Sequence, residues 1–303
     1  MCTSFSKILY INLYVSQVMW RLISSNRVKI GVGRFGYNVR YMSSGKDLLD
    51  GAKTSIQHGI NLVKTGTFSI RDVTTAPETT KTHTHTYTGN LDLALMRFRK
   101  AIDVVDNEDG DGGDVERNVV RAAAYSNAAT TLREKFRDSE NFDHATESAT
   151  NFKEAITSLE DAVGHEHIRI SKVLCDFSLL LEMVEDHEGV EAALRRALTI
   201  HSNWGLNPNS KQSPGEAAAE RTEMIVPLAA ACKAQNNMSD VLELEDPFFK
   251  CVEVAIGTNP NYTETALDHV RTFMGILDKD QSEVDFALKL FQGLKSGSAE
   301  LRK

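Results

Sequence analysis

Oxygen ligands that could hold a metal ion are concentrated in one short acidic stretch. Residues Asn107–Gly112 read Asn-Glu-Asp-Gly-Asp-Gly, the spacing that the first half of an EF-hand calcium loop requires. A complete loop also needs an apolar residue at its eighth position and a bidentate Glu at its twelfth. Asp114 and Asn118 stand at those two positions. We therefore interpret the stretch as an acidic surface loop and predict no calcium site.

Histidine and cysteine are placed no better for metal binding. His83 and His85 lie in a Thr-rich stretch without a clustered third ligand, and His165-Glu166-His167 lacks the H-E-x-x-H spacing of a zinc protease. The four cysteines form no C-x-x-C pair, which disfavours a zinc knuckle or a disulfide framework. They are Cys2, Cys175, Cys232 and Cys251. We predict no metal site.

One glycine motif points to a nucleotide instead. Gly31, Gly33 and Gly36 satisfy the G-x-G-x-x-G pattern of a dinucleotide-binding turn, and Asp50 follows at about the right distance. Such a site needs a βαβ unit around the glycines, and no further strand pattern follows them. Nucleophile-elbow, P-loop and kinase motifs are not found either. We therefore predict a non-catalytic protein without a cofactor. A nucleotide-binding enzyme that uses Gly31, Gly33 and Gly36 is the less favoured alternative.

The elements that would position any site are helices. Apolar residues recur at helical spacing in 47–64, which predicts one amphipathic helix that ends at Gly66. Residues 71–90 are Thr-rich, contain Pro77 and show no apolar period, so we expect a solvent-exposed linker there. From residue 90 onward a helix stripe of small, large and small residues recurs. It reads Ala94/Phe98/Ala101, Ala155/Leu159/Ala162, Val190/Leu194/Ala197 and, more loosely, Ala287/Phe291/Leu294.

Glycine-bearing loops place these helices in a common register. Gly113, Gly164, Gly205 and Gly257 each follow such a helix or the region where one is expected, and the last three loops share a Gly-x-x-(His/Pro) form. Glycine closes a helix in a left-handed cap, and proline prevents the helix from continuing. The array therefore reads as repeated helix pairs joined by loops.

This pattern resembles the tetratricopeptide repeat, in the long-period variant found in kinesin light chains. Ser126–Ala129 looks like the first-helix Asn-Asn-Leu-Ala segment of that family, and the resemblance covers about 90–295. It departs from the family in its longer intervals and in Pro227 and Pro247. The resemblance implies an all-α, right-handed helical solenoid of about four to five helix pairs over 90–303, preceded by one helix and the linker at 45–89. A helical bundle without repeats is the alternative.

The N-terminal segment has a different composition. Residues 1–46 contain seven Lys and Arg and no Asp or Glu, which is typical of a mitochondrial presequence. Val39–Ser44 is similar to a matrix-protease site with a cut after Tyr41, so we expect residues 1–44 to be a cleaved leader. The apolar residues 8–20 leave a secretory signal or a membrane anchor as alternatives, and Met19 is a second candidate start.

Charge limits the partners of the remaining chain. Residues 47–303 carry all 42 acidic residues against 27 of the 34 basic ones, so this part of the chain repels phosphate backbones and we expect no nucleic-acid binding. A solenoid of this family presents the first helix of each pair on a concave groove that holds a peptide or a helix. The resemblance places Asn127 there, and Lys172 and Asp176, one turn apart on the next first helix, are further candidates. The alternative for each is a solvated helix face.

These expectations combine into one functional hypothesis. We expect a non-catalytic scaffold or adaptor for protein partners, located in the mitochondrial matrix or associated with the inner membrane through a membrane complex. It would act as an assembly factor or an accessory subunit of a larger complex, for which the respiratory chain is one candidate. If the leader is not used for import, the alternative is a cytosolic cargo adaptor similar to kinesin light chain.

Overall fold

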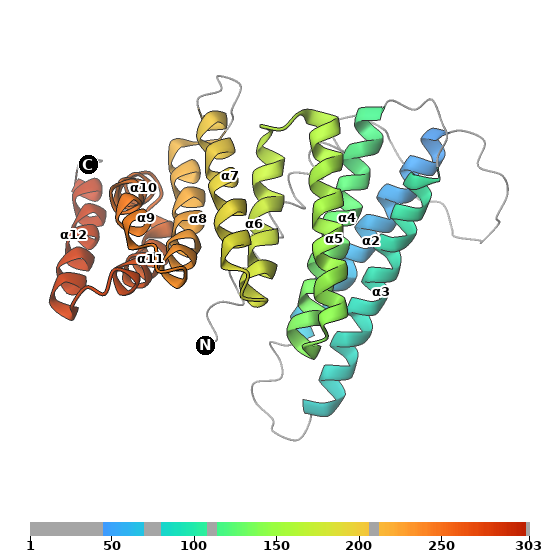
Figure 1. Cartoon of the computed structure of the whole chain (residues 1–303), viewed down its shortest axis with the longest axis horizontal. Helices are drawn as coiled ribbons and strands as arrows, with labels where there is room; N and C mark the ends of the chain where they lie inside the picture. The colour runs from blue at the N-terminus through green and yellow to red at the C-terminus, as the bar shows by residue number, and fades with distance from the viewer. Residues whose placement is uncertain (1–44, 70–79, 108–113, 206–211, 301–303) are drawn as a thin grey trace. The chain divides into compact units, whose positions relative to one another are not determined.

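Every regular element in the described part of the chain is a helix. The computed structural model describes residues 45–69, 80–107, 114–205 and 212–300, and no strand occurs among them (Figure 1). The all-α class expected from the sequence is confirmed for these residues. None of the described helices combines the length and the apolar composition needed to cross a bilayer. The expected leader, with Gly31, Gly33 and Gly36, lies outside the described residues, as does Gly113.

The chain divides into two compact units, Met1–Gly113 and Asp114–Lys303, and each is described by itself. The first unit is a pair of helices, α2 (Gly45–Ser69) and α3 (Thr80–Asp106), which pack along each other. Gly59 of α2 permits the close approach, because a Cβ atom there would lie 2.6 Å from Cε1 of Phe98 in α3. Phe98 is 1% exposed. The large residue of the predicted stripe thus fills the contact between the two helices.

The first unit differs from the sequence expectation at the linker. Helix α3 begins at Thr80, so residues 80–90, including His83 and His85, are helical and not part of a loop. Threonine costs a helix less than about 1 kcal/mol per residue, and the segment after Pro77 contains no further proline to stop it. The boundary between the compact units accordingly falls at Gly113 and not at residue 89.

The second unit consists of four consecutive helical hairpins (Figure 1). Its elements are α4 (Asp114–Ser139), α5 (Phe142–Val163), α6 (Ile168–Met183), α7 (His187–Gly205), α8 (Pro214–Ala234), α9 (Met238–Glu243), α10 (Glu245–Thr258), the 3₁₀ turn η2 (Pro260–Tyr262), α11 (Thr263–Ile276) and α12 (Gln281–Glu300). We call α4, α6, α8 and α11 the first helices. The second helices are α5, α7, the pair α9–α10, and α12. Each first helix packs against its own second helix, and each second helix packs against the next first helix.

The turn inside every hairpin is built in the same way. One residue per turn has a positive φ between 54° and 60°, and these residues are Glu140, Glu185, Asn236 and Asp278. In three of the turns, the N–H of the residue after the left-handed one donates to the carbonyl oxygen five residues earlier. The Asp186 N–H, for example, donates to the Leu181 carbonyl oxygen at 2.9 Å, which is the hydrogen bond of a Schellman cap. An Asn or Asp then caps the second helix. Asn141, for example, accepts from the Asp143 N–H at 3.0 Å.

The connections between hairpins follow the predicted glycine loops in part. Gly164 has a φ of 84° and ends α5, and His167 caps α6 by accepting from the Arg169 N–H at 3.2 Å. Gly205 is the last residue of α7. Gly257, in contrast, lies inside the last turn of α10, whose capping residue is Asn259. Gly164 and Gly205 therefore stand at the ends of α5 and α7, as predicted, whereas the residue that caps α10 is Asn259 and not Gly257.

Proline does not interrupt the third hairpin where the sequence departs from the family pattern. Helix α8 continues through Pro227. Pro247 stands in the first turn of α10, where its missing N–H would have no partner in the helix. The second helix of this hairpin is divided earlier, at Leu244, which lies between α9 and α10 and is the capping residue of both.

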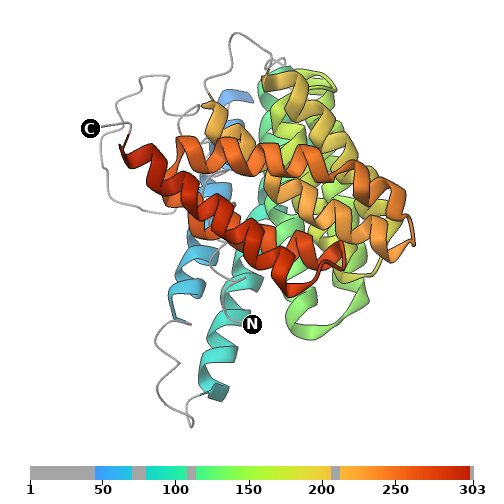
Figure 2. The same cartoon turned by 90° about the vertical axis from the view of Figure 1, so that its left-hand side faces the viewer.

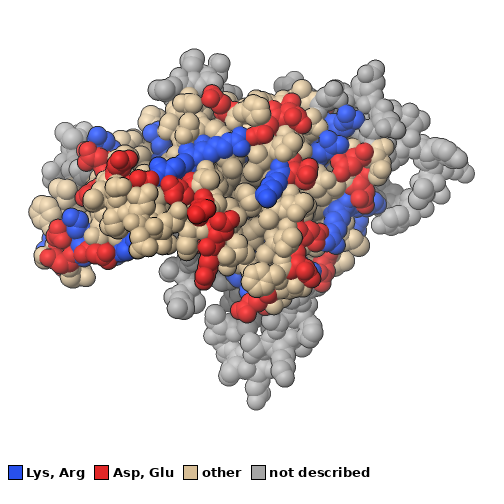
Figure 3. Space-filling model, in the orientation of Figure 1, with Lys and Arg blue, Asp and Glu red and all other residues tan. Residues whose placement is uncertain are grey.

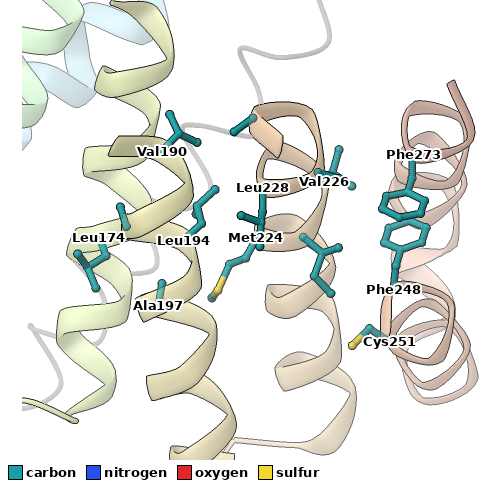
Figure 4. Close-up of a cluster of buried hydrophobic side chains, with 14 of the residues drawn as sticks. Leu174, Val190, Leu194, Ala197, Met224, Val226, Leu228, Phe248, Cys251 and Phe273 are labelled. Atoms are coloured by element: carbon teal, nitrogen blue, oxygen red, sulfur yellow. The ribbon is translucent and has the colours of Figure 1, made fainter. Parts of the chain in front are cut away.

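A continuous apolar core runs through the second unit. The stripe residues Val190, Leu194 and Ala197 are at most 2% exposed and belong to this core. Figure 4 shows Leu194 of α7 between α6 and α8, and Phe248 of α10 stacked on Phe273 of α11 with ring centroids 4.2 Å apart. Helix α12 is the last helix described, and Figure 2 shows it outermost over the final hairpin.

Candidate protein-binding surface

Two side-chain contacts place consecutive first helices beside one another. Nη1 of Arg133 on α4 donates to the backbone carbonyl oxygen of Asp176 on α6 at 3.0 Å. Nζ of Lys172 on α6 lies 3.9 Å from Oε1 of Glu220 on α8. Helix α8 in turn packs against α11. The first helices therefore form a row on one side of their hairpins, as a binding groove would require.

Half-buried polar side chains remain along this row. We call Asn127 of α4, Lys172 of α6, and Glu220 and Glu223 of α8 the first-helix strip, since each is neither buried nor fully exposed. The charges of Glu220 and Glu223 reach α6, because after burial they are among the causes that raise the pKa of the Cys175 thiol. The strip thus joins neighbouring hairpins and carries one basic and two acidic groups.

Asn127 lies on the first helix α4 and is partly accessible. Its Nδ2 donates to the Ala123 carbonyl oxygen, one turn earlier in α4, at 2.7 Å. Its backbone carbonyl oxygen accepts from the Thr131 hydroxyl at 2.8 Å. These local bonds orient the side chain on the helix surface. Contact with a ligand backbone remains a prediction.

Lys172 and Glu220 belong to a polar cluster that spans three helices. Nε2 of His201, near the end of α7, lies 2.8 Å from Oε2 of Glu220 on α8, and His201 is 1% exposed. Burial by itself raises the pKa of Glu220, but the hydrogen bond with His201 and the charge of Lys172 outweigh it. The pKa of Glu220 therefore lies below its ordinary value of 4.5. The carboxylate is held charged where it meets Lys172.

Asp176 does not share the accessibility of Lys172. It is 4% exposed, and its carboxylate Oδ1 lies 3.7 Å from Nη1 of Arg133, which is itself 2% exposed. Burial raises the pKa of Asp176, while the charge of Arg133 opposes that rise. Oε1 of Glu134 accepts from Nη2 of the same guanidinium at 3.1 Å. Asp176 thus serves the packing of α4 on α6, and we leave it out of the first-helix strip.

Sequence reasoning did not single out Glu220, Glu223 or His201. The two glutamates are three residues apart on α8 and therefore share a helix face, in a run otherwise dominated by alanine. That spacing is a usable signal for an accessible acidic face. His201 offers no comparable signal, because its partner Glu220 lies 19 positions later, in the next hairpin.

One further cluster has the residue types of a metal site. Single ligand atoms of Glu191, Cys232 and Asp240 lie within 4.8 Å of one another. The guanidinium of Arg195 lies among them. Its Nε donates to Glu191 at 2.7 Å, and its Nη2 contacts Asp240 and lies 3.9 Å from the sulfur of Cys232. Gln235 also donates to Glu191, at 2.9 Å. The cationic side chain of Arg195 thus already pairs with both carboxylates, as expected for a packing contact between hairpins.

The His165–His167 segment is a structural connection. The ring of His167 meets the indole of Trp204 edge-on, with centroids 4.9 Å apart, while its Nδ1 caps α6. Burial, followed by the charge of Arg169, lowers the pKa of His167. His165 is exposed and lies 3.5 Å from Glu160, which also pairs with Arg196 of α7. The two histidines therefore have separate partners.

The molecular surface carries both signs of charge. On the face drawn in Figure 3, acidic and basic side chains interleave across the described helices. Comparisons with known proteins add no assignment, because no protein-family model matches the chain and a search of curated protein sequences finds no match.

Proposed function

We propose that this chain is a non-catalytic scaffold that binds a protein partner along the first-helix strip. Its hairpins would form a right-handed, tetratricopeptide-like solenoid. The observation that carries the proposal is the row of first helices, in which Lys172 and Glu220 meet across neighbouring hairpins at 3.9 Å and remain partly accessible. Repeat proteins with this architecture bind extended segments because each hairpin adds one contact helix to the same surface.

The strip limits the chemistry of the partner segment. Glu220 and Glu223 outnumber Lys172, so a segment with basic side chains opposite α8 and an acidic one opposite α6 fits best. The Asn127 side chain could hydrogen-bond the backbone of such a segment without selecting its side chains. An extended peptide or one face of a helix meets these requirements.

The leader composition supports import into mitochondria, with a location in the matrix or at the inner membrane. There the scaffold would act in a larger complex as an assembly factor or an accessory subunit, and a respiratory-chain complex is one candidate. Association with the membrane would be peripheral and would depend on that complex.

Affinity purification of the C-terminally tagged chain, compared between matched variants, tests the proposal. We expect Lys172→Glu and Glu223→Lys each to reduce recovery of the partner at least about tenfold, since a charge reversal replaces attraction by repulsion. Lys153→Glu is the control, because Lys153 is exposed on the second helix α5, away from the strip. Equal recovery with all three variants would overturn the strip as the binding surface. Circular dichroism verifies that each variant is folded.

Imaging of the same tagged chain tests the location. Mitochondrial signal supports the proposal, and removal of residues 1–44 should abolish it. A cytosolic distribution of the intact chain would favour the cargo-adaptor alternative instead.

A further inference from the structure

We propose that the outer face of α12 is a dimerisation surface, on which a second copy of this chain packs its own α12 antiparallel about a two-fold axis. The surface is distinct from the first-helix strip. It is centred on Phe286 and Leu290, one helical turn apart. Its occupant is a second copy, for reasons of apolar exposure and of charge.

Helix α12 is apolar on two opposite sides. Its inner side contributes Leu288 and Phe291, which are 9% and 6% exposed and pack into the core, where Phe291 stacks on Phe249 with centroids 5.8 Å apart. Its outer side presents Phe286 at 71% and Leu290 at 57% exposure. Two residues that lie four positions apart share one helix face, so these side chains form one continuous apolar patch.

The position of α12 makes this patch unusual. A surface helix normally keeps the side that faces away from its core polar. Figure 2 shows α12 outermost on the final hairpin, and none of the described helices of the second unit lies over its outer face. An exposed apolar patch such as that of Phe286 and Leu290 is typical of a protein–protein interface.

The charges beside the patch select a second copy in antiparallel orientation. Asp285 and Lys289 are both exposed and lie one turn apart on the same flank of the patch. In an antiparallel helix pair, a flank meets the same flank of the other helix. When Phe286 of one copy packs on Leu290 of the other, each Asp285 comes beside the other copy's Lys289. The two-fold operation thus forms this ion pair twice, as an isologous interface requires.

A parallel two-fold arrangement lacks this complementarity, because each flank then meets the opposite flank of the other helix and Asp285 does not face Lys289. The 20 residues of α12 span about 30 Å at 1.5 Å per residue. One helix per copy gives an interface at the small end of the range for specific association. We therefore expect a reversible dimer that dissociates in about the micromolar range.

Analytical ultracentrifugation of the full chain, over concentrations from below to above that range, tests the proposal. We expect a monomer–dimer equilibrium, and we expect Phe286→Glu and Leu290→Glu each to weaken it at least about a hundredfold, since each change acts twice in a symmetric dimer. The matched control is Leu242→Glu on α9, a residue of similar exposure at 55%. A chain that stays monomeric, or a dimer that survives both α12 variants, would overturn the proposal.

A charge swap tests the antiparallel register. Lys289→Asp alone should weaken the dimer, because the introduced carboxylate would then meet the other copy's Asp285. The double variant Asp285→Lys, Lys289→Asp restores opposite charges across the two-fold axis and should recover the dimer. Failure of the double variant to recover it would overturn the antiparallel arrangement. The α12 variants do not alter the first-helix strip. The dimer proposal and the partner-binding proposal can therefore be overturned separately.

Discussion

The guanidinium of Arg133 donates to the backbone carbonyl oxygen of Asp176, 43 positions later in the chain, at 3.0 Å. The two side chains are also an ion pair, 3.7 Å apart, and both are almost completely buried. This contact ties the first hairpin of the second unit to the next one. A buried pair of this kind stabilises the fold only while both partners are present, because either charge left alone lacks its hydration.

Arg133→Leu should therefore lower the free energy of unfolding by about 3–5 kcal/mol, since it leaves the buried carboxylate of Asp176 without its cation. Asp176→Asn should cost less, about 1–2 kcal/mol, because the guanidinium keeps its bonds to the carbonyl oxygen and to Glu134. Urea unfolding of the full chain, followed by circular dichroism, measures both changes.

Arg271→Leu is the matched control for this measurement. Arg271 also forms an ion pair on a first helix, with Asp268 at 2.7 Å, but both side chains are about half exposed. Its removal should change the stability by no more than about 0.5 kcal/mol. Equal losses for Arg133→Leu and Arg271→Leu would contradict a structural role for the buried pair.

The contrast between Lys172 and Asp176 shows what helical periodicity can predict. Four-residue spacing correctly places both residues on one side of α6. It does not predict that Arg133, which belongs to another hairpin, buries Asp176 and leaves Lys172 partly accessible. Such a contact depends on the relative position of α4 and α6, which no local pattern in either helix encodes. The sequence therefore predicted the helix face and could not predict which part of that face is buried.

The turns show a similar limit. The glycine loops between hairpins were visible because Gly164 and Gly205 are conspicuous in the sequence. The left-handed residues of the turns within hairpins were not, because they are not glycine; Glu185 and Asn236 are examples. The Asn or Asp after each of these residues, such as Asp186, was the available signal. It is weak in a chain with many surface carboxylates.

Gly215 of α8 lies in close contact with Thr258 at the end of α10. A Cβ atom on Gly215 would lie 1.7 Å from Oγ1 and 2.7 Å from Cβ of Thr258. Because Thr258 Cβ is fixed to the backbone, Gly215→Ala must push the two helix ends apart, and we expect a loss of about 1–3 kcal/mol in stability. Thermal unfolding followed by circular dichroism measures the loss.

Gly257 provides the comparison for this substitution. It is helical and lies next to Thr258, but nothing lies within 4 Å of a Cβ atom placed on it. Gly257→Ala should raise the stability by up to about 1 kcal/mol, because alanine loses less backbone entropy in a helix. Similar effects of the two substitutions would show that helix propensity, and not the contact with Thr258, decides the outcome.

Glu220 should make the stability depend on acidic pH. Its pKa is lower in the folded chain than its ordinary value of 4.5, so its contribution to stability is present above that value and is lost as the pH falls through the folded pKa. We expect the urea midpoint of the intact chain to fall below about pH 4.5 more steeply than that of Glu220→Gln. Parallel curves for the two proteins would contradict a charged Glu220 held by His201 and Lys172.

The left-handed turn residues offer a final test through stability. Glu185 has a φ of 60°, and this conformation costs a non-glycine residue roughly 1–2 kcal/mol. Glu185→Gly removes that cost but adds chain entropy to the unfolded state, so we expect a net gain of about 0.5–1 kcal/mol. Glu188→Gly, three residues later in the first turn of α7, should instead lose about 0.5–1 kcal/mol, because glycine is a poor helix former. Urea unfolding of the two variants should therefore give changes of opposite sign. A loss of stability in both would contradict a left-handed conformation imposed on residue 185 by this turn.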